Sequence, residues 1–168
     1  VYASFVRSQL PHGRIRSIDT AAAAAAPGVV GVFTGADLVA AGIHGQVPRA
    51  LLPGFVTTPT PRPGLADTVV RHVGEPVAVV VAETRALADD AAGLVVADIE
   101  ELPAAIEITD ARAPNAPAVW PDAPDNVCQA WTHGDRDAAE RAFADAAHVT
   151  QLKLRNNRVV VNPMEVRT

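Results

Sequence analysis

The sequence predicts an α+β fold, in which short β-strands are interleaved with short helices. Two valine-rich runs, Val29–Phe33 and Val77–Ala82, have the length and composition of strands. The second run contains no polar residue, which is typical of a strand buried on both faces. A cap at Thr84 and a strand at Val96–Glu101 follow it, so strand, helix and strand form one βαβ-type unit. If the two strands are parallel, a right-handed crossover is expected.

Five further strands are predicted along the chain. Their residues are apolar or alternate with polar ones, and turn-forming residues bound them. They are Val1–Arg7, Arg14–Ile18, Thr68–Val73, Val127–Thr132 and the long region His148–Val161. Between Gly42 and Ala66 the chain is rich in proline and glycine, which predicts an irregular loop that is either mobile or in contact with another part of the protein.

The predicted helices are short, and most begin at a residue that can cap them. They are Ala21–Ala26, a turn near Leu38–Ala41, the segment after Thr84, and Asp137 to about Ala146. Asp19 or Thr20 can cap the first of them. The spacing of Thr34 and Asp37 predicts a capping box at the second. In the third, the apolar positions expected on one face are Leu87, Ala91, Leu94 and Val95.

Charge and cysteine content exclude several classes of protein. The formal net charge of -5 argues against nucleic acid or an anionic membrane as a partner, because both require a basic surface. Cys128 is the only cysteine, so no internal disulfide forms, and we expect a cytoplasmic location. The longest apolar stretch, Ala21–Phe33, is too short to span a membrane and is broken by Pro27-Gly28.

Residue spacing reveals no catalytic, cofactor-binding or metal-binding site. His72 and Glu75 come close together at a strand-to-turn junction, where an ordinary turn pair is the favoured interpretation and a ligand or cofactor contact is the alternative. Cys128 has no basic neighbour and is interpreted as a small apolar residue rather than a nucleophile. Glu100 and Glu101 are adjacent on a strand, so they point to opposite faces and cannot act as a carboxylate pair.

Two other acidic residues have a structural explanation. Asp135 and Asp137 precede or begin the last predicted helix and are better explained as capping residues than as metal ligands. No glycine-rich phosphate-binding loop occurs in the sequence.

Seven stretches, taken in order, resemble one known family. They are YASFVR (2–7), RIRSID (14–19), PGVVGVFTGADL (27–38), VGEPVAVVVAET (73–84), DAAGLVVA (90–97), ELP (101–103) and NRVVVNPMEVR (157–167). Together they resemble the large, molybdopterin-binding subunits of the xanthine dehydrogenase and aldehyde oxidase family, in particular the carbon-monoxide-dehydrogenase-like branch. The chain departs from the family pattern at Val166, where members usually have proline.

This resemblance implies an a/b hammerhead domain, an α+β fold with a mixed sheet and short packed helices. It implies that residues 1–155 form this domain and that residues 156–168 begin the connection to a molybdopterin-binding region beyond Thr168. It also implies further residues upstream of Val1. The catalytic residues of the family belong to the later region, so none is expected here. For Glu165 a structural hydrogen bond is the favoured interpretation, and a channel role or a role beside the active region is the alternative.

The resemblance also implies a function for the whole protein. Its holoenzyme would oxidise an aldehyde, a purine-like heterocycle or carbon monoxide at a molybdenum–pterin cofactor, with iron–sulfur clusters and FAD on partner subunits or domains. This fragment would be inactive alone and would contact the remainder of the large subunit. The alternative is a stand-alone ligand-binding or scaffold module with the same fold and no redox role.

Overall fold

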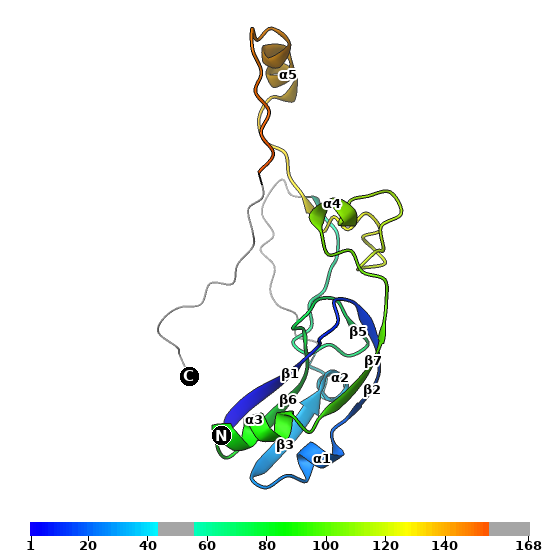
Figure 1. Cartoon of the computed structure of the whole chain (residues 1–168), viewed down its shortest axis with the longest axis vertical. Helices are drawn as coiled ribbons and strands as arrows, with labels where there is room; N and C mark the ends of the chain where they lie inside the picture. The colour runs from blue at the N-terminus through cyan, green and yellow to red at the C-terminus, as the bar shows by residue number, and fades with distance from the viewer. Residues whose placement is uncertain (44–55, 155–168) are drawn as a thin grey trace. The chain divides into compact units, whose positions relative to one another are not determined.

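The computed structural model describes residues 1–43 and 56–154, and the chain divides into two compact units (Figure 1). The first unit comprises residues 1–132 and the second begins at His133. The expected α+β class with short packed helices is confirmed. Within the described residues, the named strands pair antiparallel.

The first sheet, here called sheet A, has three strands in the order β1-β6-β3. These strands are β1 (Tyr2–Arg7), β6 (Pro76–Ala82) and β3 (Val29–Thr34). Helix α3 (Arg85–Ala92) packs against β1 and β6 and covers one face of the sheet (Figure 1). The Thr84 hydroxyl accepts a hydrogen bond from the Leu87 N–H at 3.3 Å, so the predicted cap of this helix is confirmed.

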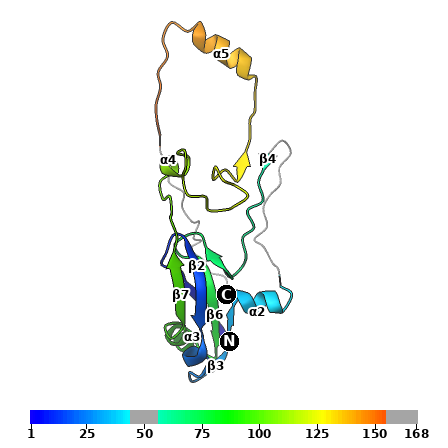
Figure 2. The same ribbon diagram turned by 90° about the vertical axis from the view of Figure 1, so that its right-hand side faces the viewer.

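The second sheet, here called sheet B, has the order β5-β2-β7, and Figure 2 shows β2 and β7 side by side. Its strands are β5 (Val69–Val70), β2 (Gly13–Asp19) and β7 (Val96–Glu101). The main core cluster joins the two sheets, because Val77 of β6 packs with Val70 of β5 and with Ala66. Half-buried residues of β2 and β7 pack against this cluster: Ile15, Ile18, Ala97 and Ile99.

Two short helices flank β3. Helix α1 (Ala21–Ala24) ends two residues earlier than predicted, and Asp19 Oδ1 accepts from its first N–H at 2.9 Å. Helix α2 (Gly35–Ala40) begins with the predicted capping box. In this box, the Thr34 hydroxyl accepts from the Asp37 N–H at 3.4 Å. The Asp37 carboxylate accepts from the Thr34 N–H at 2.7 Å, so both reciprocal bonds are present.

Thr34→Ala is expected to lower the free energy of unfolding by about 1 kcal/mol, because the capping hydroxyl of α2 is lost. The hydrogen bond from the Thr34 hydroxyl, and then that from its N–H, lower the pKa of Asp37 below 3.8. The stability that Asp37 contributes is therefore present above pH 3.8 and lost as the pH falls through its lower folded-state pKa. Urea denaturation of Thr34→Ala measures the loss of the cap, and urea denaturation at decreasing pH measures the contribution of Asp37. Thr34→Ser, which keeps the hydroxyl, should match the wild type, and a wild-type midpoint for Thr34→Ala would contradict the assignment.

The remaining elements are short. Strand β4 (Val56–Thr57) pairs with β8 (Gln129–Ala130), and helix α4 (Ile108–Ala111) lies between them in sequence. In the second unit, helix α5 (Arg136–Ala144) is capped by Asp135, whose side chain accepts from the Ala138 N–H at 2.9 Å. Asp135 is therefore the capping residue.

Three predicted strands are wrong in extent. The segment Thr68–Val73 contains only the two-residue β5, and Val127–Thr132 contains only β8. The region from His148 forms no strand over residues 148–154, and its remainder lies outside the described residues. Apolar alternation is a local signal, whereas a strand also requires a partner strand to satisfy its backbone hydrogen bonds.

The predicted βαβ unit does not form within one sheet. Strand β6 belongs to sheet A and β7 to sheet B, so α3 connects two different sheets. The buried residues of α3 are Ala88 and Ala91, and Leu94 follows the helix with 46% of its surface exposed. Ala91 belongs to the expected apolar face, whereas Ala88 does not; both are small, which allows the helix to lie close to the sheet.

The prediction that β6 is buried on both faces is also wrong. Val77, Ala78, Val80 and Ala82 are fully buried, but Val79 and Val81, which point away from Val80, are only half-buried. The described structure covers one face of this apolar strand.

Candidate functional site

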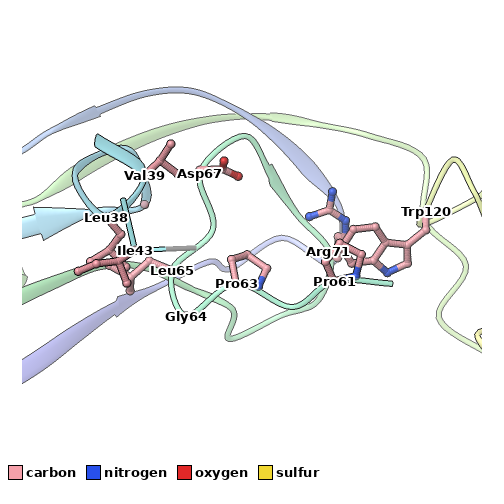
Figure 3. Close-up of a pocket in the computed structure, with 11 residues that line it drawn as sticks. Leu38, Val39, Ile43, Pro61, Pro63, Gly64, Leu65, Asp67, Arg71 and Trp120 are labelled. Carbon is pink, nitrogen blue, oxygen red and sulfur yellow. The ribbon is translucent and has the colours of Figure 1, made fainter. Parts of the chain in front are cut away.

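A pocket of about 240 Å³ lies between α2, the segment 61–67 and Trp120 (Figure 3). Figure 3 shows Arg71 and Trp120 side by side at one end, and Leu38, Ile43 and Leu65 together at the other. The remaining lining residues are Gly35, Val39, Pro61, Pro63, Gly64 and Asp67. The pocket therefore has a charged end and an apolar end.

Arg71 follows β5, and its guanidinium lies over the Trp120 indole at 3.7 Å from the ring centroid. Its Nη1 donates to the Val69 carbonyl oxygen at 3.0 Å. Its Nε is buried and has no hydrogen-bond partner among the described residues. The pKa of Arg71 is lowered from its ordinary value, because the effect of burial exceeds the opposing effect of the negative charges of Glu75 and Asp67. Arginine stays protonated in proteins even when its pKa is lowered in this way. The Arg71 end of the pocket therefore carries a fixed positive charge.

Glu75 and His72 are brought together as the sequence suggested. The Glu75 side chain is buried, and its Oε2 lies 3.6 Å from His72 Nδ1. The same oxygen accepts a hydrogen bond from the Arg71 N–H. The Ser8 N–H donates to the Glu75 carbonyl oxygen at 2.9 Å, which joins this turn to the end of β1. We interpret His72 and Glu75 as a pair that stabilises the turn between β5 and β6. The sequence favoured the same interpretation, an ordinary turn pair.

The pocket is suited to binding rather than to covalent chemistry. Among the described lining residues, only Asp67 and Arg71 carry charge, and none is a serine, cysteine, histidine or lysine. A nucleophilic mechanism requires a nucleophile within hydrogen-bonding reach of a base. The arrangement offers a donor and a π-surface at one end and apolar contact at the other.

Sequence analysis did not identify the pairing of Arg71 with Trp120. The two residues are far apart in the chain, and no local spacing links them. The available signal was Trp120 itself, since the sequence has only two tryptophans, and one within a proline-rich segment indicates a specific packing partner.

Arg71 and Trp120 are expected to be coupled by about 1–2 kcal/mol in unfolding free energy, because the stacked cation is partly removed from water. A double-mutant cycle with Arg71→Gln and Trp120→Leu, followed by urea denaturation, measures this coupling. The control pair is Arg7 and Phe5, which are exposed and 5.5 Å apart from guanidinium carbon to ring centroid. Its coupling should be about 0.5 kcal/mol or less. Equal couplings for the two pairs would contradict the assignment.

Other polar residues make separate local contacts. Glu100 on β7 forms an ion pair with Arg16 Nη2 at 3.1 Å. Asp89 pairs with Arg85 on the exposed side of α3 at 3.7 Å. Cys128 is half-buried, and its carbonyl oxygen accepts from the Thr58 N–H at 3.0 Å. Glu165 lies outside the described residues, as does part of the Gly42–Ala66 loop.

The described residues contain neither a metal-ligand cluster nor a membrane-spanning helix. Over residues 1–43 and 56–154, no group of three or more histidine, cysteine, aspartate or glutamate side chains is placed to hold a metal ion. In the same ranges, no helix has the length and apolar character needed to cross a membrane.

Comparison with known proteins identifies the family of the chain. The sequence profile described as "Aldehyde oxidase and xanthine dehydrogenase, a/b hammerhead domain" matches residues 1–103. The chain belongs to this family. The resemblance seen in the seven sequence stretches is thereby confirmed, and sheets A and B with their short helices are the a/b hammerhead.

Relatives match the hammerhead chain over nearly its whole length. The nicotine 6-hydroxylase large subunit of Paenarthrobacter nicotinovorans is 38% identical over 99% of this chain and 20% of its own length. The carbon monoxide dehydrogenase large chain of Afipia carboxidovorans is 36% identical over 98% of this chain and 21% of its own. A crystal structure of the Cu,Mo-CO dehydrogenase matches 88% of this chain and 19% of its own, with 33% identity and a TM-score of 0.68. The chain thus spans about one fifth of each relative.

Proposed function

We propose that this chain is the N-terminal hammerhead domain of the large, molybdopterin-binding subunit of an oxidoreductase of the xanthine dehydrogenase family. Two facts about the relatives together support this proposal: the share of each sequence that aligns, and their names as large subunits or large chains. At least 98% of the chain aligns with proteins named as a large subunit or a large chain, yet it accounts for 20% and 21% of their lengths. A segment with this coverage corresponds to one domain of a longer polypeptide.

Within the chain, residues 1–155 are assigned to the hammerhead domain and residues 156–168 to the start of its connection to the molybdopterin-binding region. The profile match supports this assignment for residues 1–103, which include all the strands of sheets A and B. The connection lies outside the described residues, so its assignment rests on the alignments that extend over 98% or more of the chain.

This chain does not supply the ligands of an iron–sulfur cluster. An iron–sulfur cluster is held by four thiolates, and Cys128 is the only cysteine in the sequence. The described residues also present no cluster of potential metal ligands. In keeping with the family resemblance, we propose that the molybdenum–pterin cofactor binds to the remainder of the large subunit, and that the iron–sulfur clusters and FAD belong to partner subunits or domains.

The proposed role of the domain is to support the cofactor-binding region rather than to carry out chemistry. The substrate of the whole enzyme would be an aldehyde, a purine-like heterocycle or carbon monoxide, in keeping with relatives named for nicotine and carbon monoxide. We propose a cytoplasmic location, because a chain with one cysteine forms no internal disulfide and is suited to a reducing compartment.

Metal analysis tests this proposal. The complete gene product that contains this chain should be purified with its partner subunits, and molybdenum and pterin should be quantified beside substrate-dependent dye reduction. Residues 1–168 prepared alone provide the comparison. We expect stoichiometric molybdenum and turnover in the complete protein and neither in the fragment.

Two outcomes would contradict the proposal. Molybdenum or turnover in the pure fragment would show that the chain has a reactive centre of its own. A complete gene product that holds no molybdenum but retains its ligand-binding or scaffold role would support the stand-alone module instead.

A further inference from the structure

Within residues 1–43 and 56–132, sheet A has one face covered by α3 and one open face. The covered face lies beneath α3 and carries Ala78, Val80 and Ala82 of β6, each fully buried. Directly paired residues of antiparallel strands point to the same face of a sheet. The register pairs Val79 with Phe5 of β1 and with Phe33 of β3, so these three side chains form one row on the open face.

A second row extends this surface. Val81 pairs with Ala3 of β1 and with Gly31 of β3. A side chain at Gly31 would lie 2.9 Å from Phe33 Cζ, which shows that the Phe33 ring lies over the glycine. We call the six residues of these rows the open apolar face: Ala3, Phe5, Gly31, Phe33, Val79 and Val81.

The open apolar face exposes large side chains. Phe5 is 49% exposed and Phe33 is 45% exposed. Contiguous apolar surface of this kind marks interaction sites in proteins. The composition of β6 leads to the same conclusion, because its unbroken apolar run is typical of a strand covered on both faces. The amino-acid sequence is therefore suited to a second covering layer over this face.

Arg7 adds a positive charge at the margin of the open apolar face. Its guanidinium lies 5.5 Å from the Phe5 ring centroid, and its Nη1 donates to the Gly74 carbonyl oxygen at 2.8 Å. These contacts hold the charge beside the aromatic ring. A covering surface would match this margin if it placed a carboxylate or a carbonyl oxygen opposite Arg7.

The size of the open apolar face identifies the kind of partner. A stable interface between separate proteins takes about 20–30 residues on each side, far more than this face supplies. A tethered segment needs less contact area, because a linker raises its effective concentration to the millimolar range. The relatives are about five times longer than this chain, so a tethered partner is available if the chain is part of such a protein.

We propose that the open apolar face is the surface on which the remainder of the same large-subunit polypeptide docks. The docking segment contributes apolar side chains over Phe5, Val79 and Phe33 and a hydrogen-bond acceptor opposite Arg7. This inference rests on the proposed function, since it requires a longer chain, and it specifies which face of the domain makes the contact.

Hydroxyl-radical footprinting of the complete gene product tests this docking. Tyr2 is the internal control, because it lies on the same strand as Phe5, is 53% exposed, and pairs with Ala82 on the opposite face. For each ring, the labelling rate in the native protein is compared with that in the urea-unfolded protein. We expect Phe5 and Phe33 to be protected about tenfold, whereas rings left half-exposed would show only about twofold protection.

The possible outcomes are distinct. Twofold protection of Phe5 and Phe33, equal to that of Tyr2, would overturn the docking surface. Protection that disappears on dilution together with a dimer would identify a second copy as the partner and would also overturn it. If the protein contains molybdenum but the Phe5 and Phe33 rings are not protected from labelling, only the docking inference is overturned. Protected rings without molybdenum overturn only the proposed enzyme function.

A variant provides a second measurement. Phe5→Ser with Phe33→Ser should increase proteolytic release of the hammerhead domain from the complete protein at least several-fold, and Tyr2→Ser should leave release near the wild-type rate. Slow amide exchange over Val77–Ala82 verifies that the double variant remains folded. Equal release from the double variant and Tyr2→Ser would contradict the proposal.

Discussion

Val80→Ala is expected to lower the free energy of unfolding of the chain by about 2–3 kcal/mol, because it removes two buried methyl groups and leaves a cavity. Val80 is fully buried in the middle of β6, beneath the layer that includes α3. Water that entered the cavity left by the substitution would contact only apolar neighbours, so it would not compensate for the lost methyl groups. This effect would be a large fraction of the stability of a typical domain.

Val81→Ala is the matched control for Val80. The two residues are adjacent on β6, carry the same side chain and differ in the face to which they point. Because Val81 is only half-buried, its truncation should cost about 1 kcal/mol or less in the chain alone. Urea denaturation of both variants measures the difference. Equal losses of stability would contradict the assignment of a covered and an open face to sheet A.

Gly35→Ala is expected to lower the free energy of unfolding by about 2 kcal/mol through steric conflict. A Cβ atom at this position would lie 2.5 Å from the Ala66 carbonyl oxygen and 2.7 Å from its carbonyl carbon. These are backbone atoms, and Ala66 is fixed by its place in the core and by its N–H bond to the Pro76 carbonyl oxygen at 2.8 Å. Alanine favours a helix over glycine by about 1 kcal/mol, so the net loss is smaller than the clash itself.

Gly64→Ala separates this clash from the general effect of replacing glycine. No atom lies within 4 Å of the position that a Cβ at Gly64 would occupy. Its stability should remain within about 0.5 kcal/mol of the wild type, as for an ordinary surface substitution. Thermal or urea unfolding of the two variants measures the difference. A stable Gly35→Ala variant would show that α2 does not pack against Ala66 as described.

Local signals predicted the parts of the fold whose contacts are local. The capping box of Thr34 and Asp37 was predicted from its spacing, because both of its hydrogen bonds join residues three positions apart. The cap at Thr84 and the strands around Val29–Thr34 and Val96–Glu101 were identified for the same reason. Each is determined by a few neighbouring residues.

Features that depend on distant residues were not predictable in the same way. Whether β6 and β7 share a sheet depends on which strands pair with them, and β1 and β2, which take those places, lie far earlier in the chain. The stacking of Arg71 on Trp120 likewise joins two distant segments. The open face of β6 was missed because its sequence is that of a strand covered on both sides, and the described residues supply only one layer.

The family assignment came from motif order rather than from chemistry. None of the seven stretches contains a recognisable catalytic spacing, and the pocket beside Arg71 is suited to binding alone. The resemblance therefore identified the family and the hammerhead domain, and the proposed function assigns the chemistry to residues elsewhere. Under that proposal, the spacing of His72, of Cys128 and of the acidic pairs is expected to indicate no reaction.

The central claim is that this chain is one domain of a large subunit about five times its length, in proportion to the 20% and 21% of the relatives that it covers. The most direct measurement is the length of the open reading frame that encodes it, together with the mass of the polypeptide purified from its source. We predict a frame that continues well past Thr168 and a single polypeptide of several times 17.5 kDa. A frame that stops shortly after Thr168, with a purified polypeptide of that smaller mass, would contradict the account.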